Sequence, residues 1–222
     1  MALSYDPLKY LRRSLELNPS HQDAAYMYAK YLIQNREFLE AVTYLNHFIN
    51  NFEENSRLRN LLAQAFLQLK EFDEAQNSVN IALSHTPRSI DVLHTAFVIK
   101  KAIGDKFSAL HFLERIVSLG DPSVEILCEM ADLLDSTTEL ERKINILDIA
   151  YSINPKNREI FDQLADSFLK YFKNNAFEEL NKHMIEIFLD HFKKYVPAYF
   201  SIELQKEVNQ WIKKFKGQPA LL

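Results

Sequence analysis

The sequence predicts an all-α fold in which antiparallel pairs of helices stack on one another, and three observations lead to this prediction. The chain has 222 residues with only 3 Gly and 7 Pro, too few for the many tight turns of a β-rich fold. Residues of similar size and polarity recur every 34 positions. Within each period, apolar residues occur at helical spacing twice, so each period is expected to form two helices.

The 34-residue period is clearest in what we call columns, sets of residues that lie 34 positions apart. Three proline turns share one column, at Asn18-Pro19, Thr86-Pro87 and Asn154-Pro155. In other columns most side chains have a similar size. Two columns are mainly alanine, Ala29, Ala63, Phe97, Ala131 and Ala165, and Ala41, Ala75 and Ala109, and a third is large and apolar, Leu11, Leu45, Val79, Leu113 and Leu147. Small residues at two fixed points in each period allow two helix backbones to approach closely, as a helix hairpin requires.

Residues 56–89 carry the full pattern of one such unit. Ala63 and Phe66 lie in its first helix, the segment Glu71 to Ala75 begins its second, and Ala82 and Pro87 follow. These residues resemble the tetratricopeptide repeat (TPR) family, and the resemblance extends across 7–195 with less agreement. It implies a right-handed α-solenoid whose first helices line a concave groove. The sequence departs from the family pattern at Phe97, Lys143 and Phe177.

The period divides the chain into segments. We expect a solenoid over 1–195, with a capping helix and tail over 196–222. Its parts are a half unit 7–21, units 22–55, 56–89, 90–123 and 124–157, and an atypical unit 158–195. After a break at Pro197, the last helix presents an apolar stripe of Phe200, Leu204, Val208, Trp211 and Phe215. A helix that contacts a membrane surface or a partner is the alternative for this segment. The half unit indicates either an atypical end repeat or a fragment of a longer chain.

The groove implied by the resemblance is the expected partner-binding site. Its predicted residues are Tyr26, Lys30, Arg57, Asn60, Gln64, Asp91, His94, Glu125, Cys128, Glu129, Asp132, Asp162 and Asp166. In the groove columns the first two units carry one acid and two bases, and the last three carry eight acids and two bases. We therefore expect a partner segment that bears Lys or Arg. The competing interpretation is that these acids only keep the surface soluble.

Catalytic and metal sites are not expected. His94, Cys128 and Asp162 share a column, but successive repeats hold equivalent backbones roughly 10 Å apart, beyond the ~3 Å of proton transfer. The other histidines show no ligand spacing, so neither a metal nor a cofactor is predicted. At the positions where some family members clamp a terminal carboxylate, only Lys30 matches, which disfavours acidic tails as ligands.

Composition limits the remaining function classes. The net charge of −4 argues against nucleic-acid binding. There is no secretory signal or long apolar segment, so no membrane insertion is expected. One cysteine and no Asn-x-Ser/Thr sequon favour a cytoplasmic setting.

The sequence thus predicts a noncatalytic protein–protein interaction scaffold or adaptor. The alternatives are a targeting or assembly module of a larger enzyme or secretion machine, or a chaperone of an exported subunit. Self-association through the end repeats would give a homo-oligomer.

Overall fold

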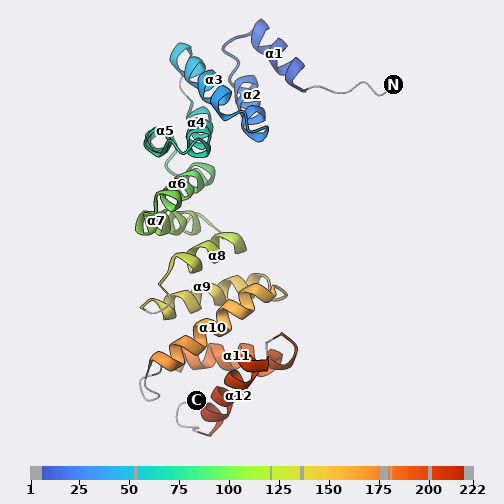
Figure 1. The fold of residues 1–222 in the computed structure, drawn as a ribbon, viewed down its shortest axis with the longest axis vertical. Helices are drawn as coiled ribbons and strands as arrows, with labels where there is room; N and C mark the ends of the chain where they lie inside the picture. Colours follow the sequence, from blue (N-terminus) through green and yellow to red (C-terminus); the bar gives the residue numbers. More distant parts are fainter. Residues whose placement is uncertain are drawn as a thin grey trace, which may run out of the picture. The chain divides into compact units, whose positions relative to one another are not determined.

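The structure is a computed structural model that describes residues 7–52, 55–120, 122–135, 138–175, 180, 182–199 and 202–217. The described residues form twelve α-helices and no strand (Figure 1). The chain divides into two compact units, unit 1 from Met1 to Gly120 and unit 2 from Asp121 to Leu222. The twelve helices of the described residues confirm the all-α prediction.

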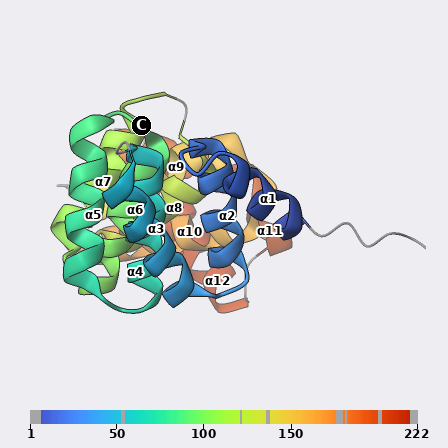
Figure 2. The same ribbon diagram turned by 90° about the horizontal axis from the view of Figure 1, so that it is seen from above.

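Unit 1 is a single helix followed by three hairpins. Its helices are α1 (Pro7–Leu17), α2 (Gln22–Gln34), α3 (Phe38–Asn51), α4 (Ser56–Gln68), α5 (Phe72–His85), α6 (Ile90–Ile103) and α7 (Lys106–Val117). Each second helix packs on its first helix, and α2, α4 and α6 also contact one another in succession. Seen from above, α5 and α7 lie along one edge of the unit (Figure 2).

Unit 2 contains two hairpins and a final helix. Its helices are α8 (Val124–Leu133), α9 (Leu140–Ile153), α10 (Arg158–Asn174), α11 (Lys182–Tyr199) and α12 (Ile202–Lys216). First helices therefore begin at 22, 56, 90, 124 and 158, in agreement with the 34-residue period. Second helices begin at 38, 72, 106 and 140, but α11 begins at 182 rather than 174. The apolar pattern of α10 continues to Phe172, so that helix runs for 17 residues and displaces the start of the next one.

The expected break at Pro197 is wrong. Helix α11 continues through Pro197 to Tyr199, and the last helix begins at Ile202. Proline in the last turn of a helix removes only one backbone hydrogen bond, which this helix end tolerates. Of the predicted stripe, Val208 and Phe215 are buried and Trp211 is half-buried. Phe200 and the side chain of Leu204 lie outside the described residues, as does Phe177.

A column of capping residues begins each first helix. His21, Asn55, Ser123 and Asn157 each accept a hydrogen bond from a backbone N–H in the first turn. Ser89 occupies the same column without such a bond. These side chains satisfy N–H groups that have no partner inside the helix, so the helices start where the caps stand.

A second column sets the turn inside each hairpin of unit 1. Arg36 and Lys70 both have φ of 63°, and Gly104 has φ of 88°. This left-handed conformation is unfavourable for residues that carry a Cβ atom, and only the third hairpin uses glycine there. The turn geometry therefore repeats although its residue type does not.

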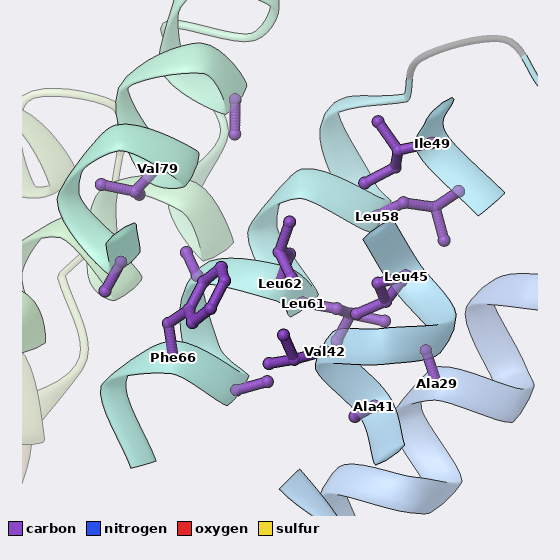
Figure 3. Packing of buried hydrophobic residues seen from close by; sticks show 14 of the residues in the cluster. Ala29, Ala41, Val42, Leu45, Ile49, Leu58, Leu61, Leu62, Phe66 and Val79 are labelled. Atoms are coloured by element: carbon purple, nitrogen blue, oxygen red, sulfur yellow. The ribbon is translucent and has the colours of Figure 1, made fainter. Parts of the chain in front are cut away.

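The core of unit 1 shows why the small residues recur. Ala29 and Ala41 face each other where α2 crosses α3, and both are fully buried (Figure 3). Ala63 and Ala75 are equally buried in the next hairpin. The large residue Phe97, which replaces an alanine in its column, is also buried.

The core of unit 2 is aromatic around its last three helices. Phe188 of α11 lies 4.9 Å from Phe172, 5.4 Å from Phe168 and 5.9 Å from Phe215, measured between ring centroids. Trp211 of α12 lies 4.8 Å from Phe172. Helix α12 thus covers the apolar side of α10 and α11 with rings from its own apolar face.

Candidate functional site

The first-helix face of unit 1, formed by α2, α4 and α6, joins three of the predicted site residues. The Arg57 guanidinium lies over the Tyr26 ring, 4.2 Å from its centroid, and the Lys30 ammonium is 5.9 Å from the same centroid. Arg57 also forms an ion pair with Asp23 at 3.2 Å. These charged groups are exposed, so the cluster is an accessible phenol flanked by cations.

Two predicted amide residues of α4 lie deeper than expected. Asn60 is only 6% exposed, and its Oδ1 atom has no hydrogen-bond partner among the described residues. Asn60 therefore offers a partner little surface. The half-buried Gln64 donates from Nε2 to the Thr95 hydroxyl at 3.1 Å, and that hydroxyl donates to the backbone carbonyl of Asp91 at 3.0 Å. This chain of bonds holds α4 and α6 together.

A pocket of about 470 Å³ opens on the same face, and we call it the unit 1 pocket. Its apolar walls come from four residues on four helices, Ile33 of α2, Phe38 of α3, Leu67 of α4 and Val98 of α6. Its polar lining consists of Gln34, Arg36, Gln64, Gln68, His94 and Thr95. Of the ten lining residues, Gln64 and His94 were predicted as site residues. Val98 shares a groove column with Lys30 and Gln64, and Arg36 and Phe38 lie in the turn and second helix that the groove columns do not include. The exposed carboxylate of Asp91 is not part of the lining.

The first-helix surface of unit 2 is acidic. Glu125 and Asp132 of α8 and Glu159 of α10 are exposed, and Glu129 and Cys128 are half-buried. Burial raises the pKa of the Cys128 thiol, and the charges of Asp132, Glu159, Glu125 and Glu129 raise it further. Carboxylates of both α8 and α10 thus act on this thiol, and their charges disfavour its thiolate form.

Two predicted acids of α10 are partly neutralised on their own helix. Asp162 pairs with Arg158 at 3.5 Å, and Asp166 pairs with Lys170 at 2.6 Å. Asp162 is also half-buried, and its Oδ1 atom has no hydrogen-bond partner in the described part of the chain. The net field of this surface therefore comes mainly from the acids of α8 together with Glu159.

The chemistry of this surface is that of fixed negative charge. The pKa of Glu125 is lowered chiefly by a hydrogen bond from its own backbone N–H and then by one from the Ser123 hydroxyl, so this carboxylate stays ionised. The raised pKa of Cys128 keeps its thiol protonated, which makes it a poor nucleophile. Within the described ranges, no three His, Cys, Asp or Glu side chains are grouped to hold a metal ion. None of the described helices has the length and apolar character needed to cross a bilayer.

Solved structures with the same succession of hairpins identify the fold. The TPR protein YrrB superposes with a TM-score of 0.63 and 13% identity, over 90% of this chain and 97% of that one. A TPR protein from Parabacteroides merdae gives 0.58 and 14%, over 96% of this chain and 80% of that one. The chain has the TPR fold.

Two further comparisons qualify that likeness. TTC0263, a TPR protein from Thermus thermophilus, superposes with a TM-score of 0.56 and 18% identity, over 73% of this chain and 89% of that one. The family model for anaphase-promoting complex, cyclosome, subunit 3 matches residues 7–80, about the first third of the chain. No curated protein matches the sequence significantly.

Proposed function

We propose that this TPR chain is a noncatalytic protein–protein interaction scaffold that holds a segment of another protein on its first-helix faces. We further propose that the segment bound at α8 and α10 carries Lys or Arg. YrrB, which has the same fold, is described as having an unusual peptide-binding site. The predicted groove residues that are exposed, such as Lys30, Arg57, Glu125 and Asp132, are the proposed contacts.

The observation that carries this proposal is the set of exposed acids on the first helices of unit 2, Glu125 and Asp132 of α8 and Glu159 of α10. Like charges held together on one surface repel one another, and a cationic partner would relieve that repulsion. Because Glu125 and Asp132 are exposed and form no ion pair with any described residue, they remain available to such a partner. A basic segment would gain both affinity and a faster encounter from this field.

The test reverses charge where the structure tolerates it. We expect Glu125→Lys/Asp132→Lys/Glu159→Lys to lose a basic partner captured from native lysate by the wild-type chain. These three residues are exposed, whereas Asp162 is half-buried and paired, so changing Asp162 would risk the fold. The captured segment is then synthesised and its affinity measured at low and high salt, since a charge-driven complex weakens with salt.

The matched control carries the same change in net charge elsewhere. Glu71→Lys/Asp73→Lys/Glu203→Lys alters three exposed acids outside the first helices. Circular dichroism establishes that both variants are folded. If both variants keep the wild-type partner, the acids of α8 and α10 form only a solvated surface and the proposal of a basic segment is wrong.

A second candidate function is an assembly module within a larger machine. The observation that favours it is the match of residues 7–80 to a subunit of the anaphase-promoting complex. Native-size chromatography of the endogenous protein separates the two candidates. Elution with several stoichiometric subunits would favour the module, and elution at the size of a single chain with a dissociable partner would favour the free adaptor.

Two finer predictions accompany the scaffold proposal. The single cysteine, Cys128, favours a cytoplasmic protein, which fluorescence microscopy of a tagged chain would test. Self-association through the end repeats predicts a mass above 26.0 kDa in multi-angle light scattering. A mass of 26.0 kDa at all concentrations would exclude it.

A further inference from the structure

The unit 1 pocket differs in chemistry from the acidic surface of unit 2. None of its lining residues is an acid, and its only permanently charged group is the guanidinium of Arg36. Its volume of about 470 Å³ lies within the range of roughly 300–1,000 Å³ typical of ligand pockets. Its walls of Ile33, Phe38, Leu67 and Val98 would exclude water from an apolar side chain seated among them.

The polar floor of this pocket is already built. Thr95 is 3% exposed, and its hydroxyl accepts from Gln64 and donates to the Asp91 carbonyl. An apolar group that enters the pocket therefore leaves no buried hydroxyl without a partner, because the Thr95 hydroxyl already makes both of these hydrogen bonds. The remaining amides, Gln34 and Gln68, can hydrogen-bond the backbone of a bound segment at the rim.

Arg36 gives the pocket its charge preference. It is exposed and, among the described residues, no ion pair involves it. Lys70 occupies the equivalent turn of the next hairpin with the same φ of 63°, but it does not border the pocket. Lys70 is therefore a matched control for Arg36, because both are cations in equivalent turns and only Arg36 borders the pocket.

A second, more open hollow continues from the first. The two hollows share Arg36 and Phe38, and the second also contacts Leu39 and Leu69. Its remaining lining residues are Glu37, Glu40 and Thr43, none of which lines the unit 1 pocket. Leu39 is 69% exposed, and its equivalent in the next hairpin is the charged Asp73. Apolar surface on both sides of Arg36 is thus a property of this turn and not of the repeat.

We infer that the unit 1 pocket anchors a large apolar side chain of a partner segment and that Arg36 pairs with a carboxylate beside that side chain. This inference rests on the proposed function, because it assigns a ligand to the first-helix face of unit 1. The segment recognised there carries an aromatic or branched apolar residue next to Asp or Glu. It is independent of the basic segment proposed for α8 and α10.

The test uses four fluorescein-labelled peptides that differ at two central positions, Trp-Glu, Trp-Gln, Trp-Lys and Ala-Glu, in a Gly/Ser background. Binding is followed by fluorescence anisotropy. We expect Ala-Glu to bind at least tenfold more weakly than Trp-Glu, because the buried ring supplies most of the affinity. We expect Trp-Glu to exceed Trp-Gln by about two- to fivefold, as a surface ion pair allows, and Trp-Lys to bind more weakly still.

The variants are chosen to keep the turn intact. Arg36→Asn removes the cation with a residue that tolerates left-handed backbone, and Arg36→Glu reverses it. Arg36→Asn should abolish the preference for Trp-Glu over Trp-Gln, and Arg36→Glu should favour Trp-Lys. The controls Lys70→Asn and Lys70→Glu should leave all four affinities unchanged.

Methyl NMR identifies the place of binding. The Trp-Glu peptide should shift the methyl signals of Ile33, Leu67 and Val98 more than those elsewhere. Equal affinity of Trp-Glu and Ala-Glu, methyl shifts at another surface, or equal effects at Arg36 and Lys70 would each overturn the inference.

The charge-reversed variant of α8 and α10 separates this inference from the proposed function. If that variant loses its basic partner but binds Trp-Glu normally, both proposals stand. If the wild-type chain does not prefer Trp-Glu over the other peptides, the pocket inference is wrong and the acidic-surface proposal is unaffected. If the charge-reversed variant keeps the basic partner, the acidic-surface proposal is wrong and the pocket inference is unaffected.

Discussion

The hairpin of α4 and α5 and the end formed by α10, α11 and α12 solve the same packing problem with opposite residue types. In α4 and α5 the fully buried residues at the contact include Ala63, Ala75 and Ala82. Around α11 the buried residues include Phe188 and Phe192, stacked 4.8 Å apart. Small residues let backbones approach closely, whereas rings fill a wider space and require more helix to surround them.

The two regions also differ in the regularity of the repeat. The hairpins that begin at 22, 56, 90 and 124 all start their second helix 16 residues after the first, including those with Phe97 or Lys143 in place of alanine. In the aromatic end the corresponding separation is from 158 to 182, and a third helix supplies Trp211 and Phe215. The aromatic end thus gives up the standard hairpin length and gains a larger apolar core.

The largest predicted effect breaks the aromatic end. Phe188→Ala should lower the free energy of unfolding of unit 2 by about 3–5 kcal/mol, because it removes a fully buried ring and leaves a cavity. Trp211 is the only tryptophan, and it lies in this cluster, so its fluorescence during urea unfolding reports on unit 2. Ile202→Ala, at a side chain 73% exposed, is the control and should leave the transition in place.

The next effect overfills the alanine contact. Ala63→Leu should destabilise unit 1 by about 1–3 kcal/mol, because the site is fully buried and the added methyl groups force helices apart. Circular dichroism should show an earlier transition for part of the helical signal, while the Trp211 transition stays unchanged. An unchanged circular dichroism transition would mean that close approach at this crossing is not required.

A smaller effect concerns the polar link between α9 and α11. The His191 ring nitrogen contacts the Asp148 carboxylate, and both side chains are mostly buried. His191→Ala should cost about 1–2 kcal/mol, because the carboxylate loses its partner. In a double-mutant cycle with Asp148→Ala, the two changes should be less than additive. Additive effects would show that the contact contributes nothing to stability.

The smallest predicted effect on stability comes from Tyr44, whose ring contacts Tyr28 in unit 1. Burial, followed by the neighbouring Tyr28, raises the pKa of Tyr44 to about 12 from 10.0. Between these pH values the folded chain holds a proton that the unfolded chain has lost, so the free energy of unfolding falls as pH rises. Because the ring is half-exposed, solvent limits this contribution to about 1 kcal/mol.

Tyr44→Phe isolates this contribution. The variant should lose less stability than the wild type when urea unfolding is compared at pH 9 and pH 11. Below pH 10 it should be at least as stable as the wild type, because the Tyr44 hydroxyl has no hydrogen-bond partner among the described residues. Parallel pH profiles for the two proteins would contradict the assignment.

The groove columns located the site only in part. Tyr26, Lys30 and Arg57 come together because Arg57 lies 34 residues after Asp23 and contacts it on the neighbouring first helix, where Tyr26 and Lys30 are the next residues on the same helix face. The groove columns miss Arg36 and Phe38, because Arg36 lies in the turn after α2 and Phe38 begins α3, outside the first helices from which the columns are drawn. They also include Asn60, which is buried, because a column specifies a position on a helix but not the depth of its side chain.

The sequence by itself determined the period of 34, the order of the hairpins and the starts of the first helices. These follow from local signals, namely apolar spacing, caps such as Asn55 and Asn157, and small residues at the crossings. Tertiary structure alone decided the length of α10, the passage of α11 through Pro197 and the pocket beside Arg36. Those features depend on contacts between helices distant in sequence, which override local preference when enough apolar surface is buried.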